Sequence, residues 1–163
     1  MVNERCGGCG LPVAGATAGC QAIRDELLAR HFSDSAYFGV HRLFVDVYCV
    51  QHPEQYCASF KSLAAHLGHL CWSLEYGGSR AVPSEPIRRW VESHPQLVRP
   101  PLPSARGAVT IGDVARASSA EEHHQAVEEW ARAAWEAYAE LQPAVREWVA
   151  SALDPKKPDR PPR

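Results

Sequence analysis

The sequence has no excess of charge of either sign and no long hydrophobic run. Among its 163 residues, Lys and Arg number 17 and Asp and Glu number 19, which gives a formal net charge of -2. A nucleic-acid-binding domain needs a basic face that displaces phosphate counterions, so this balance argues against a general nucleic-acid binder. No apolar stretch approaches the roughly 20 residues that cross a bilayer, and the opening residues lack the apolar region of a secretory signal. We therefore expect a cytoplasmic protein with neither a membrane nor a nucleic-acid partner.

Several common catalytic motifs are also missing, among them a nucleotide-binding glycine loop, a G-x-S-x-G elbow and an H-E-x-x-H zinc helix. What the chain does have is enough apolar residues, 45%, for one packed domain. It also has six cysteines and eight histidines. A reducing compartment makes a disulfide framework unexpected, so these fourteen side chains are candidates for metal binding.

Helical periodicity and turn residues predict an all-α fold. The expected helices cover residues 19–31, 35–51, 59–76, 85–94, 111–117 and 120–153, with Pro143 kinking or splitting the last one. A loop-rich CxxC cap (1–19) precedes them, and a proline-rich crossover occupies much of 79–111. We expect a single domain over 1–153, built as a bundle of about four main helices, and a disordered tail over 154–163.

Two cysteines near the N-terminus, Cys6 and Cys9, have the spacing of a zinc knuckle. The glycines beside them allow a tight turn in which both thiolates reach one tetrahedral ion. Cys20 is the expected third ligand, because the start of a helix favours a thiolate. A histidine, His52 or His41, would be the fourth. Two alternatives stay open: a redox CxxC pair, for which the thioredoxin-like βαβ context is missing, and cysteines without a shared role.

A polar stripe follows the expected second helix. His41, Tyr48 and His52 lie at spacings of seven and eleven, which return to the same direction within about 20°. Buried histidines and tyrosines need hydrogen-bond partners, and three in one apolar stripe exceed what an ordinary core uses. The alternative is that His41 and His52 are structural side chains satisfied within the core. Arg42 and Asp46 lie on another face, where a simple ion pair is expected.

Histidines on two further helices are candidates to join this stripe. The second and third expected helices are joined by a short turn and should run antiparallel, which brings His41 level with His69 and one turn from His66. On the last helix, His123 shares a side with Trp130. The alternatives are that His66 hydrogen-bonds a neighbouring helix, that His69 is exposed, and that the aromatic residues of the last helix are core packing.

Many of these residues belong to one extended pattern. It consists of Cys6-x-x-Cys9-Gly10, Gly19-Cys20, Ser33-Asp34-x-Ala36-Tyr37-Phe38, His41-Arg42-Leu43-x-Val45-Asp46-x-Tyr48-x-x-Gln51-His52-Pro53, His66-Leu67, and Glu122-His123 followed by Trp130-Ala131. This pattern resembles a family of uncharacterised bacterial proteins filed as a domain of unknown function. The resemblance covers most of residues 6–150, is most specific over 41–53, and implies no particular reaction.

A looser similarity is to DinB-like helical bundles, which hold a divalent metal on histidines from separate helices and include thiol-dependent transferases. His41, His66 and His123 would play that part here. The paired H-x-x-x-H on a late helix of those proteins is not matched, because Val127 follows His123 at that spacing. The similarity therefore serves only as an analogy.

Three functions fit these observations. The leading hypothesis is a small metal-binding protein that holds zinc, or another divalent ion. The second is a metal-dependent enzyme of hydrolase or thiol-transferase type, in which Asp46, Tyr48 and Gln51 would act on a small-molecule substrate beside an open metal position. The third is a metal-free module that forms a homodimer or binds a partner. The candidate ligands are Cys6, Cys9, Cys20, His41, His52, His66 and His123. We expect the other histidines and cysteines, among them His31, His69, His94 and His124, to have no such role.

Overall fold

The computed structural model describes residues 4–77, 84–93, 95–97 and 99–154. Its elements are α1 (Ala16–Ser33), α2 (Ser35–Phe38), α3 (His41–Gln51), α4 (Pro53–Tyr56), α5 (Phe60–Glu75), α6 (Ser84–Glu92), α7 (Ile111–Val114), α8 (Ala120–Ala137), the short 3-10 helix η1 (Ala139–Leu141) and α9 (Gln142–Leu153). The described residues form no β-strand, so the all-α prediction is confirmed. None of the described helices is long and apolar enough to span a membrane.

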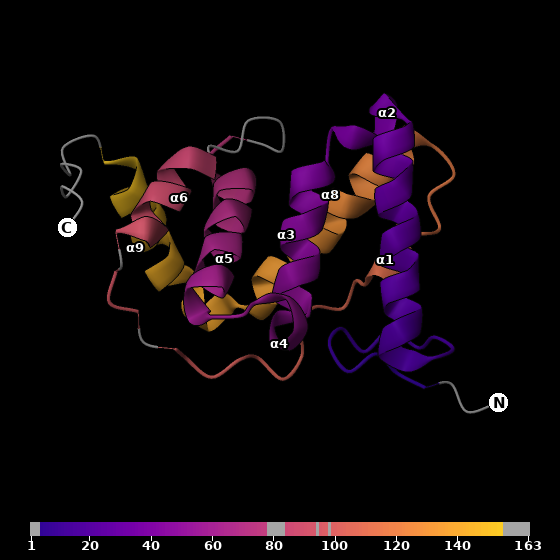
Figure 1. Ribbon diagram of the computed structural model, residues 1–163, viewed down its shortest axis with the longest axis horizontal. Coiled ribbons are helices and arrows are strands. Elements are labelled where there is room, and N and C mark those ends of the chain that lie inside the picture. The colour runs from indigo at the N-terminus through magenta and orange to yellow at the C-terminus, as the bar shows by residue number, and fades with distance from the viewer. Residues whose placement is uncertain (1–3, 78–83, 94, 98, 155–163) are drawn as a thin grey trace.

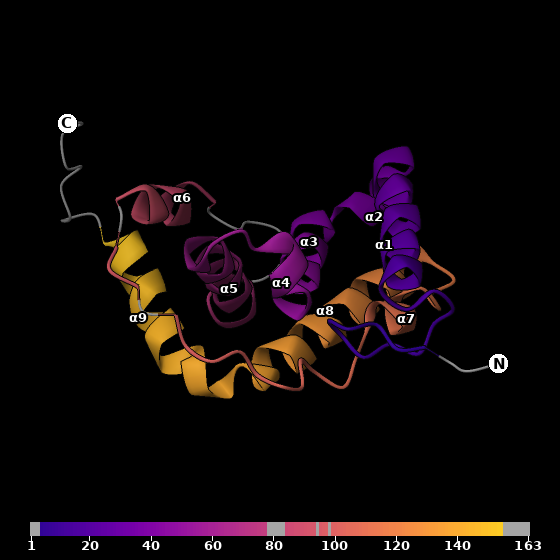
Figure 2. The same cartoon turned by 60° about the horizontal axis from the view of Figure 1, so that its bottom comes forward.

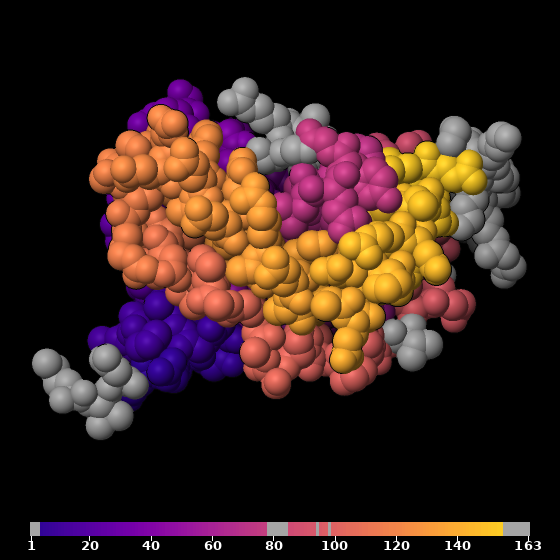
Figure 3. All heavy atoms as spheres, turned by 180° about the vertical axis from the view of Figure 1, so that it is seen from behind, coloured from indigo at the N-terminus to yellow at the C-terminus, as the bar shows by residue number. Residues whose placement is uncertain are grey.

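The helices are arranged as a row crossed by a second layer. In Figures 1 and 2, α1, α3 and α5 stand in a row, and α8 and α9 run across them. Helix α3 packs against both α5 and α8, whereas α5 also packs against α9 and α6. Seen from behind, α8 and α9 form one continuous band over this face (Figure 3). The finer expectation of a bundle of about four helices is not confirmed.

The expected second helix, 35–51, is divided into two. Asp34 caps the short α2 by accepting a hydrogen bond from the backbone N–H of Ala36 at 2.9 Å. Gly39 and Val40 then separate α2 from α3, which fits the low helix propensity of glycine. Pro53 ends α3 as expected and opens α4. Because of the break, α2 turns across the end of α3 instead of extending it (Figure 1).

The expected long helix, 120–153, is also divided, between α8 and α9. Pro143 lies in the first turn of α9, where a missing N–H costs nothing. The break itself lies at Tyr138, whose buried hydroxyl donates a hydrogen bond of 2.6 Å to the carbonyl of Val50. This bond ties the bend between α8 and α9 to the end of α3.

The N-terminal segment folds into a tight turn before α1. The Cys6 N–H donates to the Leu11 carbonyl and the Gly10 N–H donates to the Cys6 carbonyl, each at 2.9 Å. Gly10 has a φ of 76°, in the left-handed region that favours glycine. Helix α1 begins at Ala16, so the cap is shorter than the predicted 1–19. Except for Asp154, the predicted tail lies outside the described residues.

Candidate metal centre

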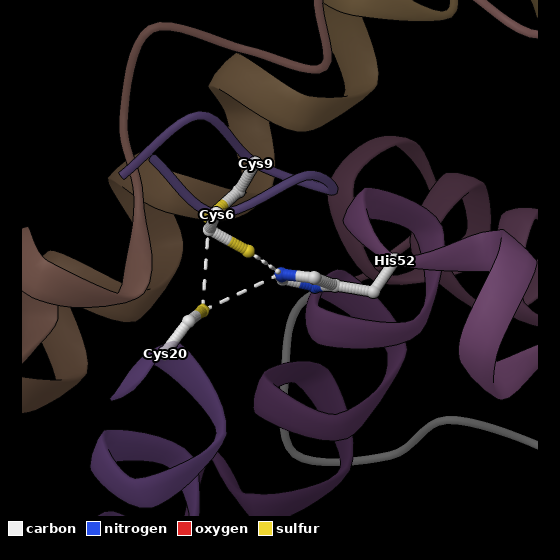
Figure 4. A group of neighbouring side chains, drawn as sticks. All are labelled: Cys6, Cys9, Cys20 and His52. Carbon is white, nitrogen blue, oxygen red and sulfur yellow. Dashed lines mark hydrogen bonds between the residues drawn. The ribbon is translucent and has the colours of Figure 1, made fainter. Parts of the chain in front are cut away.

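Three cysteines and one histidine from three segments meet at one buried point (Figure 4). Cys6 and Cys9 belong to the N-terminal turn, Cys20 to the second turn of α1, and His52 directly follows α3. Their ligand atoms all lie within 4.8 Å of one another. Three of the side chains were predicted as a set, and of the two histidines offered as the fourth member, His52 is the one that joins them.

Three of the six spacings between these atoms match those of a tetrahedral zinc site, and the other three lie within 4.8 Å. Zinc–sulfur bonds of about 2.3 Å and zinc–nitrogen bonds of about 2.0 Å place two sulfurs about 3.8 Å apart and a sulfur and nitrogen about 3.5 Å apart. The Sγ atoms of Cys9 and Cys20 are 3.7 Å apart. The Nε2 atom of His52 lies 3.4 Å from the Sγ atoms of both Cys6 and Cys20.

The imidazole of His52 is held in the orientation that a ligand needs. Its Nδ1 lies 2.8 Å from the carbonyl oxygen of Tyr48, which can only accept a hydrogen bond. Nδ1 therefore carries the proton, and the lone pair is on Nε2, which faces the sulfurs. The Tyr48 ring stacks on His52 with centroids 4.0 Å apart. A Cβ on Gly8 would come within 2.3 Å of the same ring, so only glycine fits there.

The thiols of Cys9 and Cys20 share one hydrogen bond. That bond and burial raise the pKa of Cys9 to about 12, and the same bond lowers the pKa of Cys20. All six cysteines of the chain are free of disulfides. The three thiols are therefore free to bind a metal ion, which would displace their protons.

A second polar cluster surrounds Asp46, which is completely buried on α3. His66 Nδ1, from α5, lies 2.7 Å from one carboxylate oxygen, and His69 Nδ1 lies 3.5 Å from the same oxygen. Arg42 donates to the other oxygen at 2.9 Å, as the sequence predicted, and also contacts His69. Burial opposes ionisation of Asp46, but its hydrogen bonds with the two histidines hold its pKa below the usual value. This cluster therefore already contains a cation, the guanidinium.

The three predicted catalytic residues do not meet at one point. Asp46 lies in the cluster just described, and Tyr48 stacks on His52 with its hydroxyl 3.7 Å from the Cys20 sulfur. The amide nitrogen of Gln51 donates to two carbonyls of the crossover, those of Arg106 and Val109, at 2.7 and 2.9 Å. Gln51 thus fastens the crossover to α3. A catalytic role for any of the three stays a prediction.

The remaining predicted ligands also separate. His66 joins Asp46, whereas His41 and His123 lie at the far end of α3 next to His31. The sequence predicts no ligand role for His31 or His69, and the alternative that His69 is exposed is wrong, because His69 is buried. A signal for His31 was present, because it follows Cys20 by eleven residues and so lies on the same buried face of α1. His94 lies outside the described residues.

Comparison with known proteins gives a family but no function. The chain matches the model of a family of unknown function (DUF5946) over residues 4–139. Neither the curated proteins nor the solved structures contain a match. The expected resemblance to an uncharacterised family is confirmed, whereas the detailed signature and the DinB-like similarity are not. The matched region includes all four residues of the Cys/His group, and the chain belongs to this family of unknown function.

Proposed function

We propose that this chain is a zinc-binding protein whose ion is held by Cys6, Cys9, Cys20 and His52. The observation that carries the proposal is the set of distances between their sulfur and nitrogen atoms, which fits one tetrahedral ion. Thiolate and imidazole are ligands that zinc favours, and four protein ligands leave no position for a substrate. The site is therefore structural.

The proposed ion would hold the N-terminal turn against the rest of the protein. Leu11 and Val13 pack the N-terminal turn against the core, but its described side-chain hydrogen bonds to the rest of the protein are few. Besides the metal ligands, the N–H of Gly7 donates to the hydroxyl of Thr17 at 3.2 Å. Zinc would fasten the turn to α1 and to the end of α3 at once, and its binding free energy would then be folding free energy.

Metal analysis of the purified protein tests the proposal. We expect one tightly held zinc ion that is lost in Cys9→Ser. The matched control is Cys57→Ser, because the Cys57 thiol is not a member of the group and donates instead to the Cys49 carbonyl at 3.8 Å. Loss of zinc in both variants, or in neither, would contradict the assignment.

A further inference from the structure

A chain of three histidines joins α1, α3 and α8 at the end of α1 and α3 that lies away from the N-terminal turn (Figure 1). His31 lies in the last turn of α1, His41 in the first turn of α3 and His123 in the first turn of α8. Nδ1 of His31 is 3.2 Å from Nδ1 of His41, and Nε2 of His31 is 2.7 Å from Nε2 of His123. Because the two contacts use opposite nitrogens of the His31 ring, the imidazoles form a linear chain of two hydrogen bonds.

The positions of the protons follow from these two hydrogen bonds. Three neutral imidazoles carry three N–H groups and three lone pairs, and each hydrogen bond uses one of each. The remaining N–H is therefore at one of the two ends of the chain, on Nε2 of His41 or on Nδ1 of His123. Nδ1 of His123 is buried without a partner among the described residues. Since an unpaired N–H is costly there, the N–H belongs on the partly exposed His41 and a lone pair on Nδ1 of His123.

Added protons disrupt this arrangement in two steps. If one proton is added and both hydrogen bonds are kept, both end nitrogens carry hydrogen, which places an N–H without an acceptor on Nδ1 of His123. With a second added proton, one lone pair remains for two hydrogen bonds, so two N–H groups face each other in one of the contacts. The chain therefore takes up no proton without losing a favourable contact.

The surroundings supply no negative charge for a protonated ring. Among the described residues, no carboxylate forms a hydrogen bond or an ion pair with any of the three imidazoles. The charged and titratable groups that act on them are Arg30 on α1, Arg42 on α3 and His124 on α8. Aromatic rings also pack against the chain, among them Tyr37 from α2 and Phe44 from α3. An added proton would thus face aromatic rings and two guanidinium groups.

We propose that this chain of imidazoles is an acid-sensitive latch, which holds the ends of α1, α3 and α8 together while it carries no added proton and releases them when it is protonated. Burial, with the charges of neighbouring groups, lowers the pKa of His31 and His123 to about 4. Once the helix ends separate, both rings regain the usual pKa of about 6.5 and bind protons that the closed chain rejects. The stability that the latch contributes is therefore present above about pH 6.5 and is lost as the pH falls toward 4.

Opening should be confined to this end of the molecule. The latch uses none of the four proposed zinc ligands, and Cys20 and His52 join α1 to α3 at the other end. Release of His31 would uncover part of the buried Phe44 ring, against which it packs. The latch thus controls how much apolar surface the protein presents at low pH.

Hydrogen exchange of the zinc-loaded full chain at pH 7 and pH 5 tests the latch. After correction for intrinsic exchange rates, local opening of the last turn of α1 and of α2 should increase more than about a hundredfold, because two rings gain protons on opening. His31→Phe fits among the aromatic rings but removes one titrating group, so its increase should be at least about tenfold smaller. His66→Phe, on α5, is the matched control and should show the same increase as the unsubstituted protein.

Nitrogen NMR of the histidine side chains tests the closed state without relying on opening. At pH 7, we expect His123 and His41 to carry their protons on Nε2 and His31 on Nδ1, and His31 and His123 to titrate well below pH 6.5. A proton on Nδ1 of His123, or an equal pH response in His31→Phe and the unsubstituted protein, would overturn the proposal. An increase in exchange at residues 4–20 alone would also overturn it, and would indicate loss of zinc instead.

Discussion

The Cys/His group and the Asp46 cluster both bring metal-ligating side chains within 4.8 Å of one another, yet they differ in charge. In the Cys/His group, three sulfurs and one nitrogen face a shared centre. The hydrogen bonds between them involve no positively charged side chain. In the second, Arg42 already bonds the carboxylate at 2.9 Å. We therefore expect that closeness of ligand atoms is not sufficient for a metal site. A metal site also requires that no side-chain cation, such as the guanidinium of Arg42, already neutralises the ligands.

The largest expected effect comes from removing the ion from the first group. Chelation of zinc should cost about 4 kcal/mol or more, the linkage energy of a ligand at a thousandfold its Kd. Hydrogen exchange should increase most over residues 4–20, which carry three of the four ligands, while α5 and α8, which carry none, stay more protected. Uniform loss of protection over the whole chain would show that the ion supports more than the N-terminal turn.

Removal of the charge on Asp46 should have the next largest effect. Asp46→Asn removes the buried negative charge that Arg42 and the two histidines contact and should lower the free energy of unfolding by about 2–3 kcal/mol, with zinc content unchanged. The control Asp25→Asn breaks an exposed pair with Arg24 and should cost less than about 1 kcal/mol. Urea unfolding followed by tryptophan fluorescence measures both.

The same residue predicts a dependence on pH. Because the pKa of Asp46 is lowered in the folded protein from a usual value of 3.8, its contribution is fully present above about pH 4. It is lost as the pH falls through the folded-state pKa. The difference in unfolding free energy between the unsubstituted protein and Asp46→Asn should therefore shrink below pH 4. A difference that grows on acidification would contradict the ion pair.

A methyl group at Gly8 should weaken metal binding by the first group without replacing any of its ligands. In Gly8→Ala the new Cβ would lie 2.3 Å from the His52 ring and 3.0 Å from the Gln51 carbonyl, so the ring must move. We expect zinc affinity to fall about 10–100-fold, as for other residues that orient a ligand. Gly7→Ala is the matched control, because its Cβ would meet only Thr17, at 3.7 Å. Competition with a zinc chelator measures both.

The smallest effect on stability, and the sharpest test of the comparison, comes from Arg42→Ala. The Arg42 side chain is 45% exposed, so its loss should cost only about 1–2 kcal/mol. It removes the cation from beside Asp46, His66 and His69, and we expect the variant to bind one more divalent ion than the unsubstituted protein. Arg146→Ala, which breaks a surface pair with Glu75, should bind no extra ion. An unchanged ion count in Arg42→Ala would show that charge is not what separates the two clusters.

The sequence predicts most helices and three of the four proposed zinc ligands, because these depend on local patterns. Cys6 and Cys9 are linked by their spacing, and Cys20 follows at the start of a periodic segment. The breaks at Gly39 and Tyr138 are harder to foresee. The first depends on a propensity that tertiary contacts often override, and the second on a hydrogen bond to the distant Val50.

The choice between His41 and His52 depends on tertiary structure. His41 is the first residue of α3 and His52 directly follows its last residue, so eleven positions separate them, or about 16 Å along a helix. Only one end of α3 can therefore reach the N-terminal turn. Helix α1 has the same spacing between Cys20 and His31, and the two helices run in opposite directions (Figure 1). Cys20 therefore meets His52, and His31 meets His41. Dimerisation and a small-molecule substrate stay predictions.

X-ray absorption at the zinc edge tests the central claim most directly. For protein carrying one equivalent of zinc, we expect three sulfur ligands at about 2.3 Å and one nitrogen ligand at about 2.0 Å. Protein that retains no zinc, or a spectrum with only nitrogen and oxygen ligands, would contradict the assignment of the ion to Cys6, Cys9, Cys20 and His52.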